Sequence, residues 1–134
     1  MLNKLLFILL LATFSHANFT GLTPSQLQDK IDKNIVVIDI RTAPEWKQTG
    51  IIPTSKELMF FNELGQFNTK LWIQELHKII KNKNEPFILI CRSGNRTNQV
   101  GNFLSKQLKY KNVFHLEHGI NSWIKQNRQV IKEN

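Results

Sequence analysis

The chain has 134 residues, which is the length of one domain and too short for two ordinary ones. It is 41% hydrophobic and 21% charged, with 6 glycines and 4 prolines, which excludes a disordered, collagen-like or low-complexity protein. The net charge is +8, and the single cysteine excludes an internal disulfide framework and a cysteine-rich zinc finger.

The segment 1–17 has the layout of a secretory signal peptide. Lys4 is followed by an apolar stretch, Leu5 to Phe14, and then by the small-x-small sequence Ser15-His16-Ala17. The apolar stretch is shorter than the roughly 20 residues that cross a membrane, so no stable membrane insertion is expected after cleavage; an uncleaved anchor is the alternative. We predict cleavage after Ala17 and a bacterial periplasmic protein with one domain, residues 18–134.

Capping residues and apolar runs predict the first elements of this domain. Thr23-Pro24-Ser25-Gln26 is a capping box, and it predicts a helix from Pro24 to about Lys33. The continuous β-branched run Ile35–Ile40 predicts a strand covered on both faces. Thr42-Ala43-Pro44-Glu45 is a second capping box, which predicts a short helix ending at Gly50.

The second half of the chain continues the alternation of strands and helices. We expect strands over Leu58–Phe61, Phe87–Ile90 and Val113–Leu116, and helices over Thr69–Lys81, from near Asn95, and at the end of the domain. The inward-facing residues predicted for these helices are Trp72, Leu76, Ile79 and Ile80, then Val100, Phe103, Leu104 and Leu108, then Ile120, Trp123 and Ile124. The alternation predicts an α/β fold with a mostly parallel central sheet and helices on both faces.

Cys91 directly follows a predicted strand, at the edge of a parallel sheet where ligands bind. The loop that begins there is Cys91-Arg92-Ser93-Gly94-Asn95-Arg96, and it leads into a predicted helix. Consecutive backbone N–H groups and the helix dipole would form an anion site that keeps a thiolate available as a nucleophile. A free cysteine that ends a core strand is more often an inert buried side chain. The glycine and the two arginines favour a catalytic role here.

Three blocks of the sequence are similar to the rhodanese (sulfurtransferase) family. C-R-S-G-N-R-T at 91–97 resembles its active-site loop, Cys-x-x-Gly-x-Arg followed by a small residue. I-D-I-R-T-A-P-E-W-K-Q-T-G-I-I-P at 38–53 resembles the first signature of the family, and H-G-I-N-S-W at 118–123 resembles its Gly-Gly-x-x-x-Trp ending. The chain departs from the family pattern at Ile51, where the family has histidine, and at Thr54 and His118, where it has glycine.

The resemblance implies a rhodanese-like α/β domain that transfers sulfur in a ping-pong cycle without a cofactor or metal. Cys91 would take the outer sulfur of a small anionic donor such as thiosulfate as a persulfide, and pass it to a thiol or cyanide. The expected substrate-binding residues are those of the loop, Arg92, Ser93, Gly94, Asn95 and Arg96, with Arg92 attracting the donor.

Arg96 has a second possible role that the sequence leaves open. It either binds substrate or braces the loop by pairing with Asp39 or Glu45, and its place at the helix start favours bracing. We assign loop bracing to Asp39, Arg41 and Glu45.

Other functions are weighed against this one. Tyrosine-type phosphatases also use a cysteine loop, but they have five residues between Cys and Arg, and this chain has four. A non-catalytic rhodanese-like carrier or binding module typically lacks the cysteine, and a redox role has no partner cysteine within the chain.

Metal and nucleic-acid binding are not expected. His115 and His118 lack the further donors that a metal site needs. The lysines, among them Lys78 and Lys106, fall near predicted helix ends where cations are favoured and solvated, so no nucleic-acid partner is predicted. The sequence carries no signal for an oligomeric state.

Overall fold

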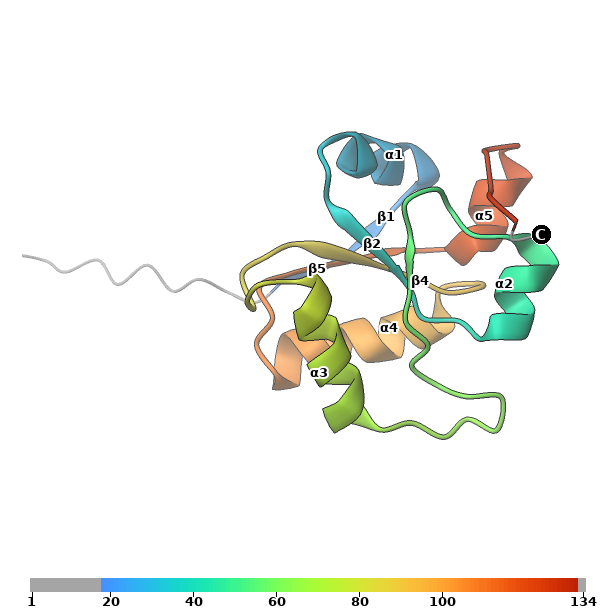
Figure 1. Ribbon diagram of the computed structural model, residues 1–134. Helices are drawn as coiled ribbons and strands as arrows, with labels where there is room; N and C mark the ends of the chain where they lie inside the picture. The colour runs from blue at the N-terminus through green and yellow to red at the C-terminus, as the bar shows by residue number, and fades with distance from the viewer. Residues whose placement is uncertain (1–17, 133–134) are drawn as a thin grey trace, which may run out of the picture.

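The computed structural model describes residues 18–132, so the predicted signal peptide and the last two residues lie outside the described part. The described chain forms one sheet of five parallel strands in the order β1-β5-β4-β2-β3 (Figure 1). The strands are β1 (Asn18–Leu22), β2 (Val36–Asp39), β3 (Lys56–Glu57), β4 (Phe87–Ile90) and β5 (Asn112–Leu116). The predicted α/β class and parallel central sheet are confirmed.

Helices cover both faces of the sheet. They are α1 (Pro24–Asp32), α2 (Ala43–Thr49), α3 (Thr69–Ile79), α4 (Asn95–Asn102) and α5 (Gly119–Lys125), with a π-helical turn, Phe103–Gln107, directly after α4. Figure 1 shows α1 and α5 on one side of the sheet and α3 and α4 on the other. Within residues 18–132, every helix is too short or too polar to cross a membrane.

The alternation of side chains along β4 explains where the core lies. Phe87, Leu89 and Cys91 pack toward α3 and α4, whereas Ile88 and Ile90 pack toward α1 and α5. All five are at most 1% exposed, as expected for a strand between two neighbours in a sheet covered on both faces. β4 is therefore the central strand, and Cys91 lies just beyond its carboxyl end, on the face of the sheet that α4 covers.

Both predicted capping boxes form. Thr23 Oγ1 accepts from Gln26 N–H at 3.2 Å, and the Gln26 side chain accepts from Thr23 N–H at 3.0 Å. At the start of α2, the Glu45 carboxylate accepts from the Thr42 N–H at 3.0 Å and from the Thr42 hydroxyl at 2.9 Å. The carboxylate of the second box is that of Glu45, one of the residues to which the sequence analysis assigns loop bracing.

Two strands differ from the sequence-based expectation. The predicted strand Leu58–Phe61 is misplaced: the strand is Lys56–Glu57, which pairs with Ile38 and Asp39 of β2. The segment that follows stays beside the end of β2, because the Leu58 and Phe60 N–H groups donate to the Asp39 and Ile40 carbonyls at 2.9 and 3.1 Å. The Phe60 ring packs 5.2 Å from that of Trp72. The edge strand β1 was not expected. It buries one residue, Leu22, and so lacks the apolar run that marks β2 and β4.

Two helix-face predictions are also wrong. Phe103 and Ile124 are each 37% exposed, whereas the other residues predicted to face inward are buried or partly buried. Phe103 begins the π-helical turn, in which the Leu108 N–H donates to the Phe103 carbonyl five residues back. Leu104 is fully buried and Leu108 partly buried, as predicted, so Phe103 lies at the margin of the buried face of this helix.

Candidate active site

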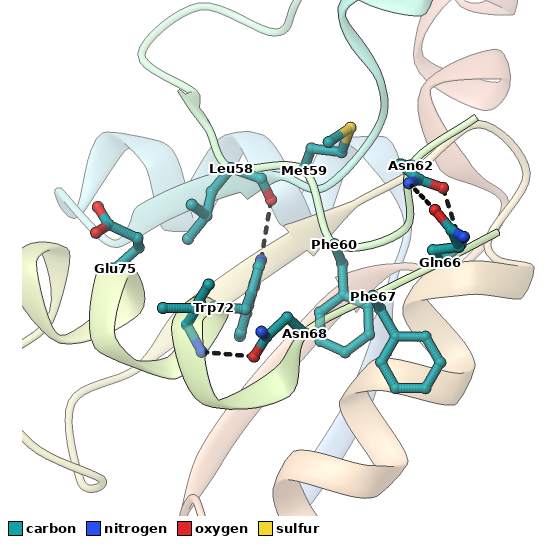
Figure 2. Close-up of a pocket in the computed structure, with 10 residues that line it drawn as sticks. Leu58, Met59, Phe60, Asn62, Gln66, Phe67, Asn68, Trp72 and Glu75 are labelled. Atoms are coloured by element: carbon teal, nitrogen blue, oxygen red, sulfur yellow. Dashed lines mark hydrogen bonds between the residues drawn. The ribbon is translucent and has the colours of Figure 1, made fainter. Parts of the chain in front are cut away.

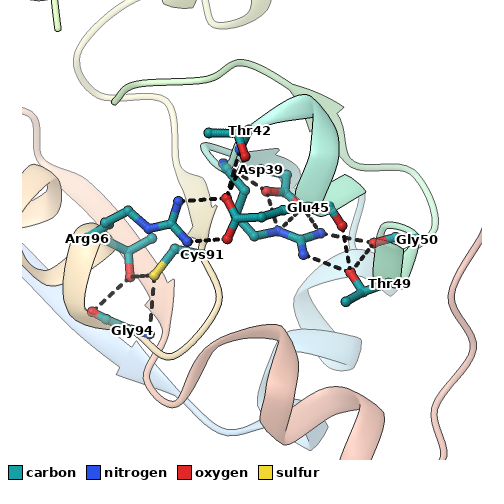
Figure 3. Close-up of polar contacts among 10 residues, drawn as sticks. Asp39, Thr42, Glu45, Thr49, Gly50, Cys91, Gly94 and Arg96 are labelled. Carbon is teal, nitrogen blue, oxygen red and sulfur yellow. Dashed lines mark hydrogen bonds and ion pairs between the residues drawn. The ribbon is translucent and has the colours of Figure 1, made fainter. Parts of the chain in front are cut away.

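The Cys91 side chain lies at the carboxyl end of β4, beneath the loop that leads into α4 (Figure 3). Its Sγ accepts a hydrogen bond from the Gly94 N–H at 3.2 Å and lies 3.4 Å from the Thr97 hydroxyl. The residue is 1% exposed. The sulfur is therefore held at the N-terminus of an eight-residue helix, where the helix dipole favours negative charge.

Two glycines allow the loop to pack this tightly. Gly94 has φ 97°, and a Cβ there would lie 1.9 Å from the Glu117 carbonyl oxygen. Gly119, at the start of α5, has φ 67°, and a Cβ there would lie 2.2 Å from the Arg92 carbonyl. The first carbonyls of the loop are bound by α5, because the Ile120 N–H donates to Cys91 O at 2.9 Å. The loop is thus clamped between α4 and α5.

Arg96 pairs with Glu45, one of the two partners considered for it. Its guanidinium donates to both carboxylate oxygens of Glu45, at 2.9 and 2.6 Å, and the two side chains are 26% and 24% exposed. Burial alone would raise the pKa of Glu45, but the hydrogen bonds from Arg96 and from Thr42 outweigh it and lower the pKa to about 2. The hydrogen bond to Glu45 raises the pKa of Arg96. The pair joins the N-termini of α2 and α4.

Asp39 and Arg41 form a separate, fully buried ion pair. Arg41 donates to the Asp39 carboxylate at 2.8 to 3.2 Å, and the two side chains are at most 1% exposed. The same guanidinium donates to the Thr49 hydroxyl at 2.8 Å and to the Gly50 carbonyl at 2.9 Å. The pair therefore ties the end of β2 to the end of α2, and the carboxylate beside Arg96 is that of Glu45 rather than Asp39.

The remaining residues of the loop face solvent. Arg92, Ser93 and Asn95 are exposed, in contrast to the buried Cys91 and Gly94 on either side. Arg92 directly follows Cys91, and its side chain is exposed. In the expected loop, the sulfur is therefore buried, whereas the side chains of Arg92, Ser93 and Asn95 are exposed.

Two residues of the site were missed by the sequence analysis. The Thr97 hydroxyl lies 3.4 Å from Cys91 Sγ, donates to the Gly94 carbonyl at 3.1 Å, and lies 2.8 Å from Nδ1 of His115. His115 was considered only as a metal ligand, but it is on β5 and 5% exposed. Strand alternation holds the signal that could have found it: His115 and the core residue Val113 lie on the same face, the one that α4 covers.

An apolar pocket of about 400 Å³ lies elsewhere, between the 58–68 segment and α3 (Figure 2). Its walls include Phe60, Phe67 and Trp72, whose indole N–H donates to the Leu58 carbonyl at 3.1 Å. None of its lining residues belongs to the Cys91 loop. The pocket is therefore distinct from the candidate active site.

Within the described residues, no three His, Cys, Asp or Glu side chains are grouped so that they could hold a metal ion.

The model of the rhodanese-like domain family matches residues 23–126 of this chain. This range includes the Cys91 loop, both ion pairs, and His115. A curated relative, an uncharacterised protein of Rickettsia prowazekii, is 31% identical over 90 residues, which are 66% of this chain and 72% of that protein.

Solved structures with a similar fold have varied descriptions. A rhodanese-related protein from Thermoplasma volcanium is 26% identical, with a TM-score of 0.63 over 85% of this chain and 99% of its own. The polysulfide-sulfur transferase of Wolinella succinogenes is 19% identical, with a TM-score of 0.66 over 87% and 80% of the two chains. A protein of Rhodopseudomonas palustris, described as a possible tyrosine phosphatase, is 18% identical, with a TM-score of 0.59 over 84% and 85%.

Proposed function

Because this chain belongs to the rhodanese-like domain family, we propose that it is a sulfurtransferase that carries sulfane sulfur as a persulfide on Cys91. The main support is the position of Cys91 Sγ, which accepts the Gly94 N–H at 3.2 Å at the N-terminus of α4. A backbone donor and a helix N-terminus both stabilise negative charge on sulfur. The thiol is thereby suited to react as a thiolate.

The proposed cycle has two displacement steps. The Cys91 thiolate attacks the outer sulfur of thiosulfate; the S–S bond of the donor breaks, sulfite leaves with the bonding electron pair, and Cys91 becomes a persulfide. Cyanide or a thiolate then attacks the outer sulfur of the persulfide. Thiocyanate or a new persulfide leaves, and the Cys91 thiolate is restored. No oxidant or reductant is needed.

The residues of the loop take different roles in this cycle. The outer sulfur of the persulfide extends about 2 Å beyond Sγ, and we expect the loop N–H groups from Arg92 to Arg96 to bind it. Arg92 is exposed and is expected to attract the anionic donor. Arg96 is paired with Glu45, which favours bracing of the loop over contact with substrate. Because Cys91 is 1% exposed, the site favours donors that end in a single accessible sulfur.

Two alternatives make different demands on the same loop. Phosphate transfer would require the Arg96 guanidinium to bind a phosphoryl group, but this guanidinium donates to the Glu45 carboxylate at 2.9 and 2.6 Å. A sulfur carrier without catalysis of its own would form the persulfide but release it only to a specific partner. The sulfurtransferase and the sulfur carrier therefore differ in the step that removes sulfur from the Cys91 persulfide.

The test is intact mass spectrometry of the purified protein after incubation with thiosulfate. We expect a gain of about 32 Da, the mass of one sulfur atom, that is absent in Cys91→Ser. Cyanide should then remove the added mass and release thiocyanate. No mass gain would refute the proposal, and a gain that cyanide cannot remove would favour the carrier.

We also propose that the protein is exported to a bacterial periplasm with cleavage before Asn18. Residues 1–17 support this by their sequence alone. Cleavage there would leave the described strand β1, which begins at Asn18, whole. The N-terminal sequence of the protein recovered from periplasmic and cytoplasmic fractions tests this proposal, and a cytoplasmic protein with an intact Met1 would contradict it.

A further inference from the structure

The Thr97 hydroxyl stands at the meeting point of three groups. It lies 3.4 Å from Cys91 Sγ, 3.1 Å from the Gly94 carbonyl and 2.8 Å from His115 Nδ1. Thr97 is fully buried, and Cys91 and His115 are 1% and 5% exposed. The contacts are therefore made away from bulk water, where each hydrogen bond needs a defined donor.

A count of protons assigns the donor at His115. A hydroxyl has one proton to donate and two lone pairs that accept. The Gly94 carbonyl can only accept, and so can the sulfur of Cys91 once it is a thiolate. With two acceptors already competing for the one Thr97 proton, Nδ1 of His115 fits only as an N–H that donates to Thr97 Oγ1.

The surroundings of His115 keep its ring in place and neutral. Strand β5 lies between β1 and β4, and the ring packs 4.6 Å from that of Phe19. Burial lowers the pKa of His115, Glu117 opposes this shift, and His118 adds to it.

Few other charges come close to this ring. Strands β1 and β4 contain no titratable side chain. On the helical side, Arg96 of α4 is paired with Glu45 and Lys106 of the π-helical turn is exposed, while Cys91 is reached through Thr97. A neutral ring has a single N–H, and the geometry places that hydrogen on Nδ1.

We propose that His115 is a positioning residue for Cys91: by donating from Nδ1 to Thr97 Oγ1, it leaves the Thr97 proton free to turn toward the sulfur. In the thiol form, the Thr97 hydroxyl donates to the Gly94 carbonyl. When the thiol proton leaves to solvent, the hydroxyl rotates and donates to the thiolate. His115 neither gains nor loses a proton in this step. The inference rests on the proposed function for its role in the reaction, but not for the thiolate itself.

Matched substitutions at His115 test the donor. The amide nitrogen of Asn occupies the position of Nδ1, so His115→Asn retains a donor to Thr97. In His115→Gln the amide lies at the position of Nε2, and in His115→Leu the donor is absent. Thr97→Val removes the hydroxyl itself. The readout is the rate at which iodoacetamide alkylates Cys91 as a function of pH, followed by intact mass, with circular dichroism to confirm that each variant is folded.

We expect the pH midpoint of alkylation to be the same in the wild type and in His115→Asn. In His115→Gln, His115→Leu and Thr97→Val it should rise by about one unit, a roughly tenfold loss of rate at a fixed pH below the midpoint. Thr97→Val combined with His115→Leu should shift no further than Thr97→Val alone, because both act through one hydrogen bond. Folded His115→Gln and His115→Leu with the wild-type midpoint, or additive shifts in the double variant, would overturn the inference.

This experiment is independent of sulfur transfer, because alkylation uses no sulfur donor. Shifted midpoints together with no mass gain from thiosulfate would support the role of His115 and refute the proposed function. A normal mass gain with unshifted midpoints would do the reverse.

Discussion

Arg96 and Glu45, 51 positions apart in the sequence, form a two-pronged ion pair that fixes the start of α4 against the start of α2. Glu45 also belongs to the capping box of α2, since its carboxylate accepts from the N–H of the N-cap residue Thr42 at 3.0 Å. The Glu45 carboxylate therefore stabilises both the first turn of α2 and the loop that joins Cys91 to α4. Changes at this pair should be felt in stability and in the geometry of the site.

Arg96→Ala should lower the melting temperature and reduce kcat. The substitution removes two charged hydrogen bonds in a partly buried place, a loss of about 1–3 kcal/mol of unfolding free energy. It also loosens the loop whose N–H groups we expect to stabilise the transferred sulfur. Melting curves and steady-state kinetics with thiosulfate and cyanide measure both effects. A variant that melts like the wild type and only raises KM would make Arg96 a substrate-binding residue instead.

The Glu45 carboxylate should set part of the acid sensitivity of the fold. Its pKa is about 2 in the folded protein and 4.5 ordinarily, so the unfolded chain binds more protons between these values. The stabilisation is complete above about pH 4.5 and is lost as the pH falls toward 2. Glu45→Gln should therefore be less stable than the wild type at pH 7, with a difference that shrinks through this range.

Glu75→Gln is the matched control for that experiment. Glu75 pairs with Lys78 at 2.7 Å, but the two side chains are 50% and 71% exposed, and such pairs contribute little. Its melting curves should follow the wild type at every pH. If Glu75→Gln and Glu45→Gln behaved alike, the pairing of Glu45 with Arg96 would have no special role in stability.

Arg92→Ala should raise the KM for thiosulfate and leave the melting temperature unchanged. The side chain is exposed and is expected to act by attracting the anionic donor. Exposed charges are screened over about 10 Å at 0.1 M salt, so the difference from the wild type should shrink as salt is added. Kinetics at low and high ionic strength measure this, and a salt-independent effect would indicate direct contact with the donor.

Gly94→Ala should disrupt the loop far more than the same change at Gly65. Both glycines have positive φ, 97° and 75°, so both substitutions cost about 1–2 kcal/mol of backbone strain. A Cβ at Gly94 would also lie 1.9 Å from the Glu117 carbonyl oxygen, whereas nothing lies within 4 Å of one at Gly65. We expect Gly94→Ala to lose persulfide formation as well as stability. Equal effects at the two positions would mean that the contact with Glu117 is easily relieved.

Thr54→Gly should stabilise the fold. Thr54 has φ 72°, a left-handed conformation that is costly for a β-branched residue, and it stands where the resembled family has glycine. Relief of this strain should exceed the added entropy of the unfolded chain, for a net gain of about 0.5–1 kcal/mol. Thr20→Gly, in the exposed edge strand β1, is the control and should lower the melting temperature. A lower melting temperature for Thr54→Gly would show that Thr54 is held without strain.

Local patterns in the sequence were enough to predict much of this fold. The run Phe87–Ile90 is a strand with the predicted bounds, because a central strand covered on both faces has to be apolar throughout. Edge strands escape this requirement, which is why β1 was missed and β3 misplaced. Phe103 was misassigned because it lies at the margin of the buried face of its helix, where its side chain is 37% exposed.

The candidate site could also be predicted only in part from the sequence. The loop from Cys91 to Arg96 is contiguous, so its residue types could be read together. The contact between Thr97 and His115 joins α4 to β5, and nothing in the spacing of the two residues indicates it. That Arg96 pairs with Glu45 and not with Asp39 also depends on packing, because Asp39 is buried in an ion pair with Arg41.

The order of strands in the sheet has a consequence for the path of folding. β1 pairs only with β5, in register from Asn18 with Asn112, and Ile51 forms an antiparallel bridge with Ile131. The pairing with β5 joins the first described residues to the last described strand, and the bridge joins the segment after α2 to Ile131. Contacts between residues so far apart in the sequence slow folding. The sheet cannot be completed until β5 has been synthesised, so the N-terminal strand waits unpaired. For the export we propose, we expect the chain to stay unfolded until β5 has emerged, which suits passage through a translocation channel.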